Sequence, residues 1–200
     1  MLKSWLVEPH AEQIVLPARP KWSVRSAATL PFLSDLQLQP TAKLFTHFAQ
    51  ICINDQLVLQ DIELQGSKES ASEIQHKLPW VLIDDEQHTA PVLQFRSEPC
   101  RAYLRNTLAN ALKTQEIKPN HHEMVARWKL FVSEVRITPV EHFWHDTTAI
   151  VQLCLNNEIE IHGIRVQENN SLHWPNALSF VDPALCAMLD ASIQSALARQ

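Results

Sequence analysis

The sequence predicts an α+β protein built from two tandem copies of one small unit. Three short blocks of sequence recur in the same order, and each block has the periodicity of strand or helix. Self-similarity in a fixed order is typical of repeated structural units. Only two glycines, Gly66 and Gly163, occur in 200 residues. Phosphate-binding loops, dinucleotide fingerprints and nucleophile elbows each need several clustered glycines, so all three are excluded.

The first recurring block is predicted to be a strand. It reads LSDLQLQP at 33–40 and VSEVRITP at 132–139. Leu36 and Leu38 alternate with polar residues in the first copy, as Val135 and Ile137 do in the second. Alternation of this kind places one face of a strand against a core.

The second block is predicted to be a β-hairpin. It reads AQICINDQLVLQDIEL at 49–64 and VQLCLNNEIEIHGIRV at 151–166. Asn54-Asp55 and Asn156-Asn157 separate two apolar-alternating runs in each copy. Two-residue hairpin turns need positive φ angles, which Asn and Asp tolerate better than other residues with a side chain.

Both hairpins are also expected to contain a β-bulge in the returning strand. The apolar spacing there slips from two to three residues, between Leu59 and Ile62 and again between Ile161 and Ile164. One extra residue in the strand would restore the alternation. The bulges are predicted at Gln60-Asp61 and His162-Gly163.

The third block is predicted to be a helix, at 102–115 and at 187–200. Apolar residues recur there at helical spacing. Pro99 and Pro183 lie just ahead, where a helix tolerates proline. The predicted divisions are an N-terminal extension (1–32), a first repeat (33–115), a linker (116–131) and a second repeat (132–200). The extension is expected to pack on the surface, with helix left open as its conformation.

The second copy resembles the SpoVG septation-regulator family. VSEVRITP resembles the family's V-x-D-V-R first strand, and two further motifs match the strand H-x-I-R-V and the loop N-N-x-L. The residues on these motifs are His162, Ile164, Arg165, Val166, Asn169, Asn170 and Leu172. The first copy keeps Asp61 and Ile62 but has Glu63 where the family has arginine.

The resemblance implies a small α+β fold that pairs into a dimer and serves as a nucleic-acid-binding regulator. In a tandem chain the two copies would form a pseudo-two-fold pair, so we expect a monomer with an internal pseudo-dimer. The family's basic M-P-S-x-[KR] segment is missing from both copies. WVLIDD (80–85) and WPNALS (174–179) stand in its place.

Charge argues against general attraction to nucleic acid, because the formal net charge is −5. The second copy offers only Arg136, Arg165 and Arg199 as cations. No apolar run is long enough for a membrane span and the N-terminus does not read as a signal peptide, so we expect no membrane partner and a cytoplasmic location. The four cysteines form no CxxC pair and are expected to be buried hydrophobes.

Two sets of residues are candidate binding sites. The nucleic-acid candidates are Arg96, Arg101, Arg105, Lys113 and Arg165, for which the alternative is a solvated face. The interaction-surface candidates are Trp80 and Trp174, which are taken as equivalent between copies. Base stacking, a protein-binding hot spot and packing between the copies are all open for these tryptophans.

No catalytic residue, cofactor or metal site is expected. Histidines cluster only at His121-His122-Glu123 and at His142 to Asp146, far in sequence from the cysteines. Asp84-Asp85-Glu86 is interpreted as a solvated loop. Two function classes remain: a regulator that binds DNA or RNA through the first repeat, or a protein-interaction adaptor that has lost the nucleic-acid surface.

Overall fold

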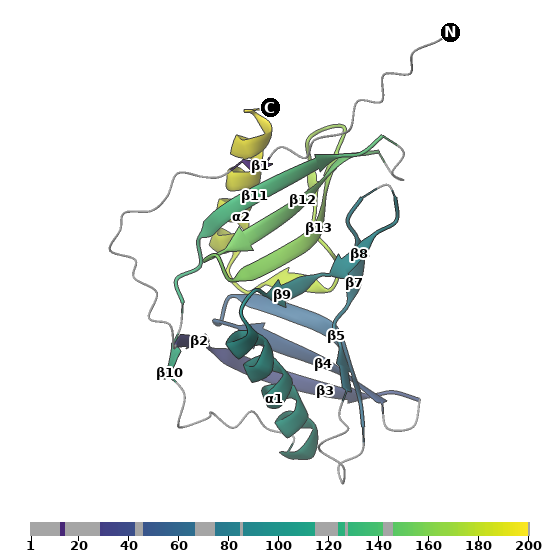
Figure 1. Cartoon of the computed structure of the whole chain (residues 1–200), viewed down its shortest axis with the longest axis vertical. Coiled ribbons are helices and arrows are strands. Elements are labelled where there is room, and N and C mark those ends of the chain that lie inside the picture. Colours follow the sequence, from purple (N-terminus) through teal and green to yellow (C-terminus); the bar gives the residue numbers. More distant parts are fainter. Residues whose placement is uncertain are drawn as a thin grey trace.

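The computed structural model describes residues 13–14, 29–42, 46–66, 75–84, 86–114, 124–126, 128–141 and 146–199. Within these ranges the chain is mixed α+β, as the sequence predicts, with mostly antiparallel sheets and two helices. Figure 1 shows the two main sheets one above the other, each with a helix beside it. Of the extension at 1–32, only 13–14 and 29–32 are described.

The first sheet consists mainly of strands from the N-terminal half of the chain. Its order is β15-β5-β4-β3, and β6 also pairs with β5. The strands are β3 (Leu33–Pro40), β4 (Thr46–Ile53), β5 (Leu57–Gln65), β6 (Gln75–Lys77) and β15 (Leu178–Phe180).

The second sheet has the same plan in the C-terminal half. Its order is β1-β11-β12-β13-β14, and β9 also pairs with β13. The strands are β1 (Gln13–Ile14), β9 (Leu93–Phe95), β11 (Val132–Pro139), β12 (Thr147–Leu155), β13 (Ile159–Gln167) and β14 (Leu172–His173).

Two small pairings complete the strand inventory of the described residues. β2 (Thr29–Pro31) runs parallel to β10 (Met124–Ala126). β7 (Trp80–Leu82) and β8 (Thr89–Pro91) form an antiparallel hairpin between β6 and β9. The second half of the chain has no hairpin between β14 and β15, only residues 174–177.

The predicted hairpin turns are confirmed. Asn54 and Asp55 have φ of 55° and 56°, and Asn156 and Asn157 have φ of 54° and 53°. The Asn54 side chain also accepts a hydrogen bond from the backbone N–H of Phe32 at 3.1 Å. Asn156 accepts from Phe131 in the same way at 3.0 Å. Each turn therefore fixes the residue just before the sheet's first long strand.

Both predicted bulges are confirmed by the strand registers. Ala49 faces Ile62 and Ile51 faces Leu59, which leaves Gln60-Asp61 opposite one residue. In the second sheet Val151 faces Ile164 and Leu153 faces Ile161, leaving His162-Gly163 opposite one residue. Asp61 and Gly163 adopt positive φ, 58° and 75°.

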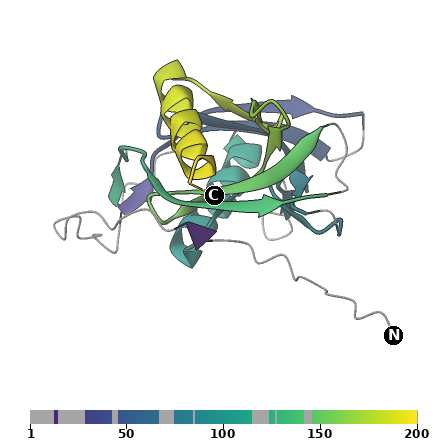
Figure 2. The same ribbon diagram turned by 90° about the horizontal axis from the view of Figure 1, so that it is seen from above.

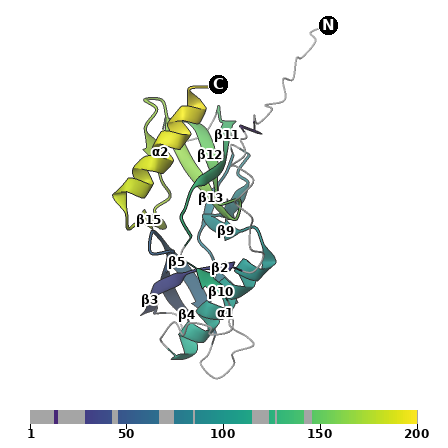
Figure 3. The ribbon, with the colours of Figure 1, turned by 90° about the vertical axis from the view of Figure 1, so that its left-hand side faces the viewer.

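Each sheet is completed by a strand from the other half of the chain. Phe95 of β9 faces Ile159 of β13, and Phe180 of β15 faces Leu57 of β5. Figure 3 shows β9 and β15 at the junction of the two sheets. At both bulges the crossing chain accepts a backbone hydrogen bond of 2.9 Å, from His162 to Val92 and from Gln60 to Ala177.

The helices are α1 (Glu98–Thr114) and α2 (Pro183–Leu197). Asp182 caps α2 by accepting from the N–H of Ala184 at 2.8 Å, and Pro183 begins the helix. Figure 2 shows α2 lying over the β11–β13 sheet, which it contacts at β11. The predicted apolar stripes are buried, including Leu104 and Leu108 of α1 and Leu189 and Ile193 of α2.

One continuous apolar core runs through both halves. It contains side chains from both main sheets and both helices. Three of the four free cysteines are buried in the fold as expected, and Cys186 is half-buried. The two halves therefore share their interior rather than forming separate cores.

Candidate functional site

The predicted arginine cluster begins with Arg96, which lies just after β9. Its Nε donates to Glu160 Oε1 at 2.7 Å and its Nη2 donates to Glu134 Oε2 at 2.8 Å. Glu160 is on β13 and Glu134 is on β11, and both carboxylates are mostly shielded from solvent. Arg96 therefore links a strand of the first half to the sheet of the second.

Glu160 is the centre of this polar network. It also accepts from Gln94 Nε2 at 2.6 Å and from Gln152 Nε2 at 3.2 Å. His162, Arg96 and Gln94 lower the pKa of Glu160 to about 2, against the opposing effect of burial. His162 Nε2 lies 3.7 Å away, too far for a hydrogen bond, so Arg96 and Gln94 are the closer anchors of the ionised carboxylate.

Arg101 and Arg105 share a single carboxylate on α1. Glu98 accepts from Arg101 Nε at 2.9 Å and from Arg105 Nη2 at 2.5 Å. Arg101 also donates to the backbone carbonyls of Phe95 and Arg96. These contacts use several donors of Arg101 but only one of Arg105, and both side chains remain 45% exposed.

The other two nucleic-acid candidates lie apart from this cluster. Lys113 is exposed in the last turn of α1, about 12 Å along the helix axis from Arg105. Arg165 is on β13 beside β14, with its Nη2 3.0 Å from His173 Nδ1. The five residues therefore do not form one basic surface.

The two candidate tryptophans are in different environments. Trp174 is partly buried, donates from Nε1 to Asp190 Oδ1 at 2.9 Å, and meets Phe180 edge-on with centroids 4.8 Å apart. Trp80 is 53% exposed at the start of β7. Trp174 therefore contributes to packing, whereas Trp80 is available at the surface.

The expected equivalence of Trp80 and Trp174 is wrong in register. Lys77 faces Glu63 across β6 and β5, and His173 faces Arg165 across β14 and β13. These ladders place Leu78 at the position of Trp174. The sequence alignment that paired the two tryptophans is therefore off by two residues. The β7–β8 hairpin begins directly after this position in the first half and has no counterpart between β14 and β15 in the second.

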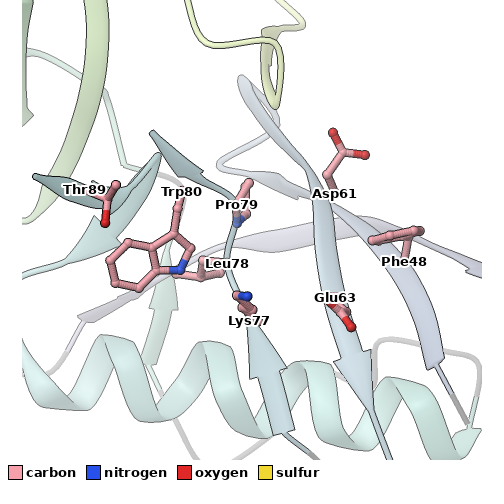
Figure 4. Close-up of a pocket in the computed structure, with 8 residues that line it drawn as sticks. All are labelled: Phe48, Asp61, Glu63, Lys77, Leu78, Pro79, Trp80 and Thr89. Carbon is pink, nitrogen blue, oxygen red and sulfur yellow. The ribbon is translucent and has the colours of Figure 1, made fainter. Parts of the chain in front are cut away.

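Trp80 is one of the residues around an open groove on the first sheet. The groove has a volume of about 510 Å³. Figure 4 shows Trp80 and Phe48 on opposite sides, with Asp61 and Glu63 of β5 between them. The lining residues are Phe48, Asp61, Glu63, Lys77, Leu78, Pro79, Trp80 and Thr89.

A cross-strand row forms part of the groove. Phe48 of β4 faces Glu63 of β5, which faces Lys77 of β6. Phe48 is 43% exposed, a large fraction for a phenylalanine on a sheet. Among the described residues, Asp61, Glu63 and Lys77 form no ion pair, and Glu63 accepts only from Gln65 Nε2.

The corresponding face of the second sheet is covered. Ile150, which faces Arg165 as Phe48 faces Glu63, is only 3% exposed. The β7–β8 hairpin contacts β13 there, beside the sheet in Figure 1. A β-carbon on Gly163 would lie 2.6 Å from Val81 Cγ2, so Val81 fills the space above that bulge.

Sequence reasoning missed Phe48, Asp61 and Glu63 as site residues. The sequence did carry one signal, because Asp61 aligns with Gly163 and Glu63 with Arg165. The exposure of Phe48 could not be read from the sequence, since the apolar residue at the equivalent strand position, Ile150, is buried.

No group of three or more metal-ligating side chains gathers within the described ranges. Asp84 of the predicted acidic loop accepts from both the backbone and the ring of His88, at 3.0 and 2.7 Å. Asp85 and the histidine clusters at 121–123 and 142–145 lie outside the described residues.

Comparisons of the chain with protein family models, with curated proteins and with solved structures found no match. Neither described helix has the length and apolar character needed to cross a bilayer.

Proposed function

We propose that the chain is a non-enzymatic protein-interaction adaptor on a duplicated SpoVG-like scaffold. In this proposal the two copies pair as a pseudo-two-fold unit within one monomer. The reciprocal pairings of β9 with β13 and of β15 with β5 support it, because Ile159 and Leu57, which the second sequence block aligns, each face a strand from the opposite half. The matching turns and bulges support it as well.

The observation that carries the adaptor function is the unequal covering of two corresponding sheet faces. The β7–β8 hairpin covers the second sheet at Gly163, whereas the first sheet leaves Phe48 exposed beside Trp80. Exposed aromatic side chains around a groove are typical of protein-binding sites. A groove of about 510 Å³ is large enough for several side chains of a partner.

A regulator that binds DNA or RNA is the alternative proposal. Its support is the SpoVG resemblance and the half-exposed pair Arg101 and Arg105, whose shared Glu98 a phosphate could replace. Arg96 is less suited to this role, because it pairs with two shielded carboxylates. The net charge of −5 also favours the adaptor.

A two-part binding experiment separates these functions. The full chain is panned against a random peptide display library and titrated into labelled DNA and RNA at about 50 and 200 mM salt. Peptides that bind the wild type and lose affinity for Phe48→Ala and Trp80→Ala would support the adaptor. Salt-sensitive nucleic-acid binding that disappears in Arg101→Ala/Arg105→Ala, without groove-dependent peptides, would replace it with the regulator.

A further inference from the structure

We propose that the groove binds an extended segment of a partner protein in which an aliphatic residue lies next to a lysine or arginine. This inference rests on the proposed adaptor function and specifies the ligand. The inference follows from two observations. On the second sheet Val81 packs against Gly163, and on the first sheet the charged residues Asp61 and Glu63 occupy the corresponding face.

The second sheet shows the kind of segment that fits such a face. The cover there is a short β-hairpin, and its Val81 packs directly on the backbone of Gly163. Ile150, on the neighbouring strand, is buried. An extended segment with an aliphatic side chain therefore fits against the bulge of this face.

The first sheet differs at the bulge itself. Asp61 takes the place of Gly163 and has the same positive φ, but it carries an exposed carboxylate. A partner segment placed like the β7–β8 hairpin would put the side chain equivalent to Val81 next to the Asp61 carboxylate. An aliphatic side chain there would leave the carboxylate unpaired. A cationic side chain would pair with it instead.

The remaining lining residues agree with a mixed apolar and cationic ligand. Glu63 adds a second carboxylate beside Phe48, where the second sheet has Arg165 beside Ile150. Among the lining residues that the structure describes, Lys77 is the only cation, so the two carboxylates outnumber it. Phe48, Leu78 and Trp80 offer apolar and aromatic surface for the aliphatic part and for the methylene groups of lysine or arginine.

The lengths of the two connections also explain why the described residues leave this groove open. After β14 the second half returns through only residues 174–177, where the N–H of Leu178 donates to the carbonyl of Pro175 at 3.0 Å. The equivalent connection in the first half includes the whole β7–β8 hairpin. The described part of the second half therefore sends nothing of comparable length toward Asp61.

The test uses the full chain and two synthetic peptides. One alternates valine and arginine over six residues, and the other replaces each arginine by glutamate. Fluorescence anisotropy measures the affinity of each peptide for wild type, for Asp61→Asn/Glu63→Gln, and for Glu141→Gln, an exposed carboxylate on the second half. Asparagine retains the tolerance for positive φ at position 61.

We expect wild type to bind the arginine peptide at least about tenfold more tightly than the glutamate peptide. The Asp61→Asn/Glu63→Gln variant should lose most of this preference, and Glu141→Gln should keep it. A preference that survives in the groove variant, or is lost equally in the control, would overturn the inference. Equal binding of both peptides that still depends on Phe48 would overturn the ligand class but leave the adaptor function standing. Absence of binding by these peptides and by every library peptide would overturn both.

Discussion

Val81 lies so close to Gly163 that a β-carbon at position 163 would be only 2.6 Å from Val81 Cγ2. Gly163 also has a φ of 75°, a conformation that side-chain-bearing residues rarely adopt. This contact holds a hairpin of the first half against the sheet of the second. It explains why glycine, scarce in the rest of the chain, occurs at this bulge.

Replacing Gly163 with alanine should destabilise the fold. The new methyl group would meet Val81 and also strain the backbone, so we expect a loss of about 1–3 kcal/mol in the free energy of unfolding. Urea denaturation followed by circular dichroism measures it. The control is Asp61→Gly at the other bulge, where relief of positive φ and the added chain entropy of glycine nearly cancel, leaving a change within about 0.5 kcal/mol. Similar losses in both variants would contradict the role of Val81.

Arg96 should stabilise the fold rather than serve as a binding residue at the surface. Arg96→Ala leaves Glu160, which is mostly shielded, without its nearest cation, whereas Glu134 keeps its ion pair with Arg136 at 3.1 Å. We expect a loss of about 1–3 kcal/mol in the free energy of unfolding, since solvent still screens part of the pair. Arg105→Ala removes an exposed ion pair and should cost less than about 0.5 kcal/mol. Equal effects in thermal or urea denaturation would show that Arg96 is an ordinary surface residue.

Glu160 should make stability depend on pH in the acid range. Because its folded-state pKa is lowered from 4.5 to about 2, its ionised form stabilises the fold above pH 4.5. That contribution is lost as the pH falls from about 4.5 toward 2. Wild type should therefore lose on the order of 2 kcal/mol more unfolding free energy than Glu160→Gln between pH 5 and 2.5. Urea titrations at these two pH values give the difference, and parallel losses would mean that other carboxylates govern the acid response.

The features that were predictable from sequence are local ones. Asn54-Asp55 specify their turn through backbone preference, and the slip from Leu59 to Ile62 specifies the bulge through the apolar period. Both signals lie within a few residues of the structure they encode. For the same reason they recur in the C-terminal half, where Asn156-Asn157 and Gly163 play the same roles.

The unpredicted features depend on contacts between distant parts of the chain. β9 and β15 have three residues each, too few for a periodic signal, and each pairs with the opposite half. The carboxylates that pair with Arg96 lie 38 and 64 positions away in sequence. A cluster of arginines has the same sequence pattern whether its partners are phosphates or the protein's own glutamates. The sequence alone therefore could not distinguish a nucleic-acid site from internal ion pairs.

The exchange of strands predicts that neither half folds alone. A fragment of residues 1–118 lacks β15, which completes the first sheet, and a fragment of residues 119–200 lacks β9, which completes the second. Each fragment would also expose its part of the shared core. We expect both fragments to unfold without a cooperative transition when measured separately by circular dichroism.

Mixed in equal amounts, the two fragments should restore the transition and form a 1:1 complex on calibrated light scattering. The control is the full chain with a protease site inserted after residue 118, which should stay associated after cleavage because β9 and β15 still cross between the halves. A cooperative transition in the 119–200 fragment alone, at the midpoint of the intact chain, would show that the crossing strands add nothing to the stability of each sheet. Independent folding of both halves would also remove the shared core as the reason for their pairing.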